Sequence, residues 1–313
     1  MNIRTMLAAG CALASLSTTL PAYAITYHLS DDRYGTLRLS GSMGMLKGDA
    51  SEYVYKENGS HLSELNWRIP ETQIAKLGVS WDINDRINLD LRGWTTLSAH
   101  KTQMDDYDWT RDDAHWSNWS THPDTTLRYA TMLEMGLNAW LITAPSWRLG
   151  LATGYDSSRF AWSSRGGQYR YNDGEQVGSF DPDARVVDYQ QRYDVPWMGI
   201  AGQVRTGHFE MNALAKFSNA ARGVGEDTHY LRGLSFRDEV ERARYYGMTL
   251  DAGYYMTSQF KLFTEATWNY YEESKGHSTV TDAATNQSYE TGDGNVGMRR
   301  QDYSVSMGMQ LSF

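Results

Sequence analysis

The sequence predicts an all-β protein: a ten-stranded antiparallel transmembrane β-barrel that extends above the membrane. Three observations support this class. Apolar and polar side chains alternate with the period of two that a strand has. Short and long connections alternate between these segments. Aromatic residues reach 13% although mean hydropathy is −0.59, as expected for a barrel that is apolar outside and polar inside.

The N-terminus is typical of a secretory signal. Arg4 precedes an apolar run, and Ala22-Tyr23-Ala24 fits an A-x-A cleavage site. We expect a signal peptide over residues 1–24 and one barrel domain over residues 25–313. Cleavage would remove Cys11, the single cysteine. Disulfides, thiolate catalysis and cysteine-bound zinc would then be excluded for the mature chain. A lipoprotein signal at Cys11 is the alternative, but the apolar run before it is very short.

Ten strands are expected along the mature chain. In the clearest segments, such as Ile87 to Leu97 and Tyr303 to Phe313, every second side chain is mostly apolar, and a helix would need a 3.6-residue period instead. In chain order, the predicted strands cover residues 34–50, 61–83, 86–104, 125–142, 147–171, 186–204, 208–222, 242–256, 260–279 and 296–313.

The connections assign the two ends of the barrel. Tight connections lie at residues 84–85, 143–146, 205–207 and 257–259, and long ones at 51–60, 105–124, 172–185, 223–241 and 280–295. Outer-membrane barrels have short periplasmic turns and longer outer loops. Several strands exceed the roughly 9–11 residues needed to cross a bilayer, so the barrel should project above it.

Two motifs contain the candidate chemistry. Asp106-Tyr107-Asp108 and Asp227-Thr228-His229 each put two ionisable side chains on one side of an extended backbone. They fall in the second and fourth long loops, which belong to the same outer end. Three carboxylates and an imidazole would meet there, a set that can activate water for hydrolysis.

Face parity adds a condition to this placement. Asp106 and Asp108 would point into the barrel, because the odd-numbered positions of their strand are apolar and face lipid. Asp227 and His229 have odd numbers, and in their strand the odd-numbered positions also face lipid. A bulge between Asn219 and Gly225 must therefore reset the register.

Several sequence blocks resemble the omptins, outer-membrane proteases of Gram-negative bacteria, over essentially the whole mature chain. The blocks are Gly93-Trp94-Thr95-Thr96-Leu97, Met104-Asp105-Asp106-Tyr107-Asp108-Trp109, His122-Pro123-Asp124-Thr125, Arg148-Leu149-Gly150-Leu151, Arg165-Gly166-Gly167-Gln168-Tyr169, Asp227-Thr228-His229-Tyr230, Ala252-Gly253-Tyr254-Tyr255 and Phe313.

The resemblance implies a surface endopeptidase in the outer membrane, with its active site facing the exterior. Asp106, Asp108, Asp227 and His229 map onto the family's catalytic residues. His229 would be the base that deprotonates water, oriented by Asp227, while Asp106 and Asp108 share a proton around the water or the carbonyl. No metal or cofactor is expected. Carboxylates and imidazole are ordinary cation ligands, so a divalent cation remains an alternative.

The same resemblance implies a pocket for basic residues at the cleavage site of a peptide or protein. Glu52 maps onto one pocket acid, and Met104 and Val187 onto other substrate contacts. The family's second acid falls at Gly225, where this chain has no carboxylate. Glu226 is the neighbouring candidate, although it would point elsewhere. His122 also maps near the groove, and a loop-capping role is at least as consistent with the sequence.

Lipopolysaccharide is the expected activating lipid. The family's lipid A contacts map onto Tyr155, Ser157, Arg159 and Arg192. Strand parity points both arginines at lipid, where a phosphate would offset the cost of a bare charge. Arginines that snorkel to headgroups without specificity are the alternative.

Other function classes are weighed against this one. A non-catalytic surface adhesin or structural barrel is the main alternative, and a lipid-A-modifying barrel enzyme would need its site at the lipid interface. Ten strands enclose too narrow a lumen for a porin. A formal charge of −9 argues against nucleic acid as a partner.

Overall fold

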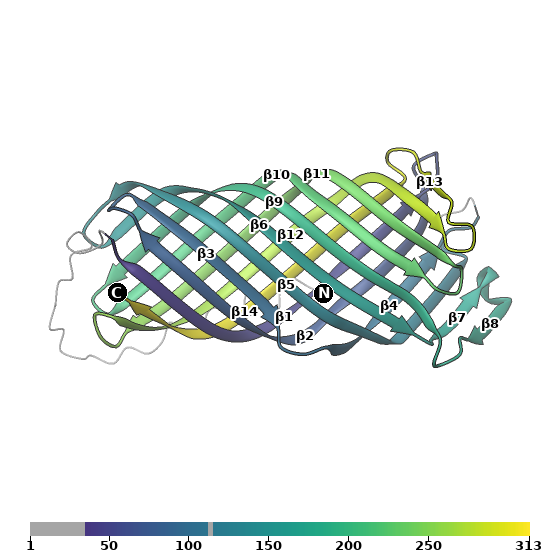
Figure 1. Ribbon diagram of the computed structural model, residues 1–313, viewed down its shortest axis with the longest axis horizontal. Helices are drawn as coiled ribbons and strands as arrows, with labels where there is room; N and C mark the ends of the chain where they lie inside the picture. The colour runs from purple at the N-terminus through teal and green to yellow at the C-terminus, as the bar shows by residue number, and fades with distance from the viewer. Residues whose placement is uncertain (1–34, 112–114) are drawn as a thin grey trace.

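A computed structural model describes residues 35–111 and 115–313, so the expected signal peptide lies outside the described residues. The chain forms a closed antiparallel barrel (Figure 1). Its wall strands are β1 (Leu37–Tyr55), β2 (His61–Asp82), β3 (Ile87–Thr96), β4 (His100–Asp108), β5 (Asn118–Thr143), β6 (Trp147–Arg165), β9 (Arg185–Thr206), β10 (Phe209–His229), β11 (Leu234–Tyr255), β12 (Phe260–Asp282) and β14 (Val296–Ser312).

The ring closes with ten strand positions. β3 and β4 share one position, because both pair with β2 on one side and β5 on the other. β14 pairs with β1 and β12, which joins the two ends of the sheet. The predicted ten-stranded antiparallel barrel is therefore confirmed. Within the described part of the chain, no helix is long and apolar enough to cross a membrane.

The strands continue further at one end than the sequence indicated. β4 includes Asp108, β10 includes His229, and residues 230–233 form a tight turn where a long loop was expected over residues 223–241. The expectation was wrong because strand ends were placed where outward apolar residues stop. Beyond an apolar belt both faces of the wall can be polar, so the alternation ends while the ladder continues.

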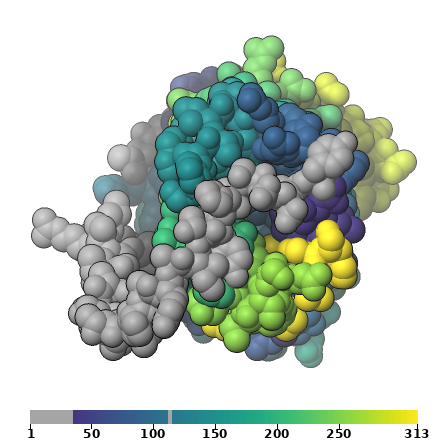
Figure 2. Space-filling view, turned by 90° about the vertical axis from the view of Figure 1, so that its left-hand side faces the viewer, coloured from purple at the N-terminus to yellow at the C-terminus, as the bar shows by residue number. Residues whose placement is uncertain are grey.

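Three short strands lie outside the main ring. β7 (Gln168–Tyr171) and β8 (Gln176–Ser179) form a hairpin beside β5, joined by the 3-10 turn Asn172–Gly174, and β13 (Ser288–Glu290) pairs with β12. All three lie at the end that carries the long connections (Figure 1). Figure 2 looks onto the opposite end, where β14 stops.

An apolar belt covers the half of the wall nearer the short connections. Exposed apolar side chains face outward on adjacent strands there, for example Met43 opposite Met307 and Met45 opposite Val305. A continuous exposed apolar band of this kind fits the hydrocarbon core of a bilayer. Glu52 lies further along β1, beyond this belt. The ends of β4 and β10 also lie beyond the belt.

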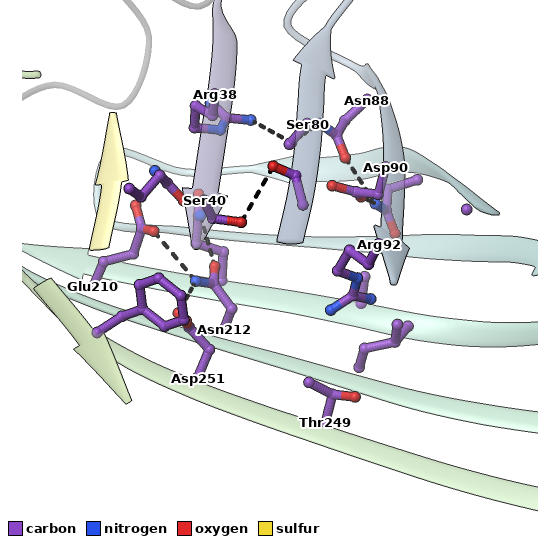
Figure 3. A pocket seen from close by; sticks show the side chains of 18 of the residues that line it. Arg38, Ser40, Ser80, Asn88, Asp90, Arg92, Glu210, Asn212, Thr249 and Asp251 are labelled. Atoms are coloured by element: carbon purple, nitrogen blue, oxygen red, sulfur yellow. Dashed lines mark hydrogen bonds between the residues drawn. The ribbon is translucent and has the colours of Figure 1, made fainter. Parts of the chain in front are cut away.

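The barrel interior behind the belt is polar and holds its charges in pairs. Lys216 Nζ lies 2.8 Å from Glu134 Oε2 and 2.7 Å from Asp156 Oδ2, and all three side chains are buried. A cavity of about 550 Å³ opens beside this group, on the side of the short connections. Figure 3 shows its lining, with Glu210, Asn212 and Asp251 linked by hydrogen bonds. Buried charges are stabilised by such pairing.

An aromatic stack closes the lumen above the charged layer. Tyr189 lies 5.1 Å from Trp67 and 5.8 Å from Trp162, measured between ring centroids. These rings belong to a buried apolar cluster that also contains Met104 and Val187. The cluster forms a packed floor for the polar side chains at the outer end.

Candidate active site

The end of β4 places Asp106 and Asp108 inside the barrel mouth. The cross-strand partner of Asp106 on β2 is Leu65, and Ser63 Oγ donates a 3.2 Å hydrogen bond to Asp106 Oδ1. Burial, together with the charge of Asp108, raises the pKa of Asp106 to about 7. Burial also raises the pKa of Asp108. A carboxyl pair in this setting retains a proton near neutral pH.

The end of β10 supplies a histidine held by a carboxylate. His229 Nε2 lies 2.6 Å from Asp227 Oδ2, and the two side chains are 12% and 3% exposed. Phe236 on β11 packs its ring against the imidazole, with 5.2 Å between the centroids. Contact through Nε2 leaves the other ring nitrogen, Nδ1, to exchange a proton.

A bulge in β10 turns Asp227 and His229 inward, as the parity condition required. The ladder with β9 shifts register between Phe217 and Arg222, and the ladder with β11 shifts between Ser218 and Gly223. Phe217 points outward in the belt, whereas Asp227 is buried. The predicted register change is confirmed. It lies between Phe217 and Gly223, which overlaps the predicted stretch from Asn219 to Gly225.

The two motifs act on each other across the barrel mouth. The charge of His229 lowers the pKa of both Asp106 and Asp108 against the raising effect of burial. Arg232, in the turn after β10, acts on both carboxyls in the same direction. Sequence reasoning missed Arg232, because its position in a presumed long loop gave no indication that its charge acts on the site.

A second residue that sequence reasoning missed comes from the β7–β8 hairpin. Burial, together with the charges of Asp106 and Asp108, raises the pKa of Tyr171 to about 12. The tyrosine hydroxyl is therefore protonated near the aspartate pair. Residues up to 171 were expected to continue a wall strand. That strand is interrupted at Gly166 and Gly167, and β7 then continues along β5 in the same register, with Gln168 opposite Thr121.

The residues expected to contact substrate occupy two different environments. Glu52 is buried on β1, and burial followed by the charge of Asp227 raises its pKa well above the usual range. Met104 and Val187 are buried in the apolar floor, and Val187 is the cross-strand partner of His229. Glu226 instead lies on the outer face, where it pairs with Arg237 and accepts a hydrogen bond from Gln190. The structure does not bring Glu226 to the buried acids.

His122 is a structural contact between segments of the outer end. Its Nδ1 lies 2.6 Å from the Gly166 carbonyl oxygen, and its Nε2 lies 3.0 Å from Ser120 Oγ. The ring stacks on Phe180, and burial lowers its pKa. Both ring nitrogens are engaged, so His122 holds the base of the β7–β8 hairpin against β5.

The residues expected to contact lipopolysaccharide form one patch on the outer wall. Arg159 on β6 and Arg192 on β9 are direct cross-strand partners. Asp194 accepts hydrogen bonds from Ser157 and Arg192, whereas Arg159 is exposed and has no ion pair within the described residues. Tyr155 is exposed on the same face. Two facing arginines with one carboxylate leave an excess positive charge that an anion could balance.

Carboxylates and imidazole are possible metal ligands. Across residues 35–111 and 115–313, no group of three or more His, Cys, Asp or Glu side chains has the arrangement of a metal site.

Comparison with known proteins places this geometry in context. The model of the omptin family matches residues 34–313. The plasminogen activator of Yersinia pestis is 37% identical over 97% of this chain and 95% of its own length. Protease 7 of Escherichia coli K12 is 33% identical over 87% of this chain and 89% of its own. The crystal structure of outer membrane protease OmpT from Escherichia coli superposes with a TM-score of 0.85 at 31% identity, covering 89% of this chain and 97% of that one.

Proposed function

Because the chain belongs to the omptin family of outer-membrane proteases, we propose that it hydrolyses peptide bonds next to basic residues with water activated by His229. The observation that carries the proposal is the 2.6 Å contact between His229 Nε2 and Asp227 Oδ2, at the barrel end that also holds Asp106 and Asp108. An imidazole fixed by a buried carboxylate is a general base in hydrolytic sites.

The proposed reaction needs no covalent intermediate. Nδ1 of His229 takes a proton from water as the oxygen attacks the peptide carbonyl carbon. Asp227 stabilises the imidazolium that forms. The proton shared by Asp106 and Asp108 hydrogen-bonds the carbonyl oxygen, where negative charge develops. When the C–N bond breaks, the imidazolium returns its proton to the leaving amine, which restores the starting state.

A cleavage assay on an arginine-containing peptide with lipopolysaccharide tests the catalytic roles. His229→Ala should reduce kcat to the background rate. His277→Ala is the matched control, because His277 is a partly exposed histidine at the same end, near Asp293. Cleavage by His229→Ala at the parent rate would rule out this mechanism. No cleavage by the parent itself would favour the non-catalytic adhesin.

We also propose that lipopolysaccharide activates the enzyme through Arg159 and Arg192. Support comes from their cross-strand pairing on the outer wall and from the excess charge of that patch. Arg159→Ala with Arg192→Ala should abolish stimulation by lipopolysaccharide. Arg244→Ala removes an outward-facing arginine from another strand and should leave stimulation intact. Unchanged stimulation in the double variant would show that the patch binds headgroups without specificity.

A further inference from the structure

The position of the missing pocket acid is filled from the neighbouring strand. Gly225 on β10 is the direct cross-strand partner of Asp238 on β11. A Cβ atom at Gly225 would lie 2.9 Å from Met298 Sδ and 3.4 Å from Asp238 Cβ. A side chain at position 225 would therefore displace Met298. The space that an acid at position 225 would enter is occupied by Met298 and bordered by Asp238.

Asp238 and Glu52 are buried carboxylates without a resident cation. Their exposed fractions are 3% and 4%. Asp238 Oδ1 and Glu52 Oε2 have no hydrogen-bond partner in the described part of the chain, and no described Lys or Arg forms an ion pair with either. Buried charges are normally paired, because desolvation without a partner is costly. Burial accordingly raises the pKa of both acids, to about 7 for Asp238, and a positive charge from outside the chain would stabilise their ionised forms.

The two acids lie close to each other on either side of Met298. The carboxylate of Asp238 contributes to the raised pKa of Glu52, so the two groups are close enough to repel each other. Met298 is the cross-strand partner of Glu52 on β14 and also reaches Gly225 on β10. The Met298 side chain thus extends between the two acids. Its Sδ lies 3.7 Å from Tyr189 Oη, which adds an aromatic wall.

The group formed by Glu52, Asp238, Met298 and Tyr189 suits the side chain of arginine or lysine. The methionine and the tyrosine ring can pack against an aliphatic stem, and the carboxylates can bind the charged head. Glu226, the other acid near position 225, points outward and is already paired with Arg237.

We infer that Asp238 replaces the missing acid at position 225 and, with Glu52, binds the basic side chain next to the cleaved bond. This inference rests on the proposed proteolytic function. It assigns the preference for basic residues to Asp238 on β11, which lies outside the Asp227-Thr228-His229 motif of β10.

Two peptides that differ at one side chain test the inference. One carries arginine before the cut and the other citrulline, which has nearly the same shape without the charge. The measured quantity is the ratio of their kcat/KM values. For Asp238→Asn the ratio should fall about thirtyfold, because one charge-assisted hydrogen bond contributes about 2 kcal/mol. Cleavage of the citrulline peptide should stay within a few-fold of the parent.

Glu226→Gln is the matched control. It removes the same charge one residue from Gly225 but on the outer face, and its ratio should equal the parent's. Asp238→Glu keeps the charge and should retain most of the preference. Circular dichroism of each purified variant, compared with the parent, confirms that the barrel has formed.

Three results would overturn the inference while proteolysis itself stands. The first is cleavage of both peptides by Asp238→Asn at the parent rates. The second is an equal loss on both peptides, which leaves the ratio unchanged and would mean that Asp238 acts on His229 instead. The third is a fall of the ratio in Glu226→Gln. Failure of the proposed function looks different: the parent would cleave neither peptide, or His229→Ala would cleave both at the parent rate.

Discussion

Replacing Asp227 by asparagine isolates the charge that supports His229, the proposed general base. The substitution preserves the shape of a side chain that is buried against His229, with 2.6 Å between Oδ2 and Nε2. It removes the negative charge that would stabilise the imidazolium. Binding of the peptide, which uses other residues, should change little. The loss is therefore expected in kcat, with KM nearly constant.

The size of the effect follows from the geometry. Two unit charges about 4 Å apart, at an effective dielectric constant of about 20, attract each other by about 4 kcal/mol. A barrier raised by about 4 kcal/mol slows a reaction about a thousandfold. We thus expect Asp227→Asn to lower kcat by about three orders of magnitude.

The assay is steady-state hydrolysis of a fluorogenic arginine peptide by purified protein with lipopolysaccharide. Asp238→Asn is the nearby control, since it neutralises another buried acid of the same region and should act mainly on substrate preference. A loss of kcat below tenfold in Asp227→Asn would refute the charge-stabilisation argument. A rise in KM with constant kcat would instead place Asp227 among the substrate contacts.

Three further outcomes concern stability. Burial raises the folded-state pKa of Asp106 to about 7. Between about pH 4 and pH 7 the folded state therefore holds a proton that the unfolded chain has released. The free energy of unfolding, measured in urea, should fall as the pH rises through this window, and it should fall less in Asp106→Asn. Lys216→Met leaves Asp156 without its cation and should lower the unfolding free energy by about 3–5 kcal/mol, with partial recovery in the double variant with Asp156→Asn; no recovery would contradict the pairing. Gly225→Asp should cost about 1–3 kcal/mol through overpacking against Met298, and equal cost in a Met298→Ala background would show that Met298 is not the obstacle.

The belt half of the barrel could be predicted from the sequence, because lipid imposes an apolar side chain at every second position there. The same rule located the bulge in β10, since Asp227 and His229 had the wrong parity. It failed above the belt. The interruption between β3 and β4 and the β7–β8 hairpin lie at or beyond the end of the belt, where lipid no longer imposes the alternation, so their boundaries could not be predicted from it.

The candidate site divides in a similar way. Motif spacing identified Asp106, Asp108, Asp227 and His229, because i and i+2 residues share a face. Asp238 has no such signal. Its inferred role depends on pairing with Gly225 across two strands, and that register follows from the bulge and the short turn after His229. Tertiary pairing of this kind is not encoded by the local sequence around Asp238.

The bulge in β10 makes the two halves of that strand separately adjustable in evolution and in engineering. Deleting one residue between Ser218 and Gly223 would rotate every later side chain to the opposite face, so that Asp227 and His229 would point outward. The belt half would keep its register and could still insert into the membrane. Length changes at this point should therefore be tolerated in steps of two residues, while single-residue changes yield an inserted barrel without a working site.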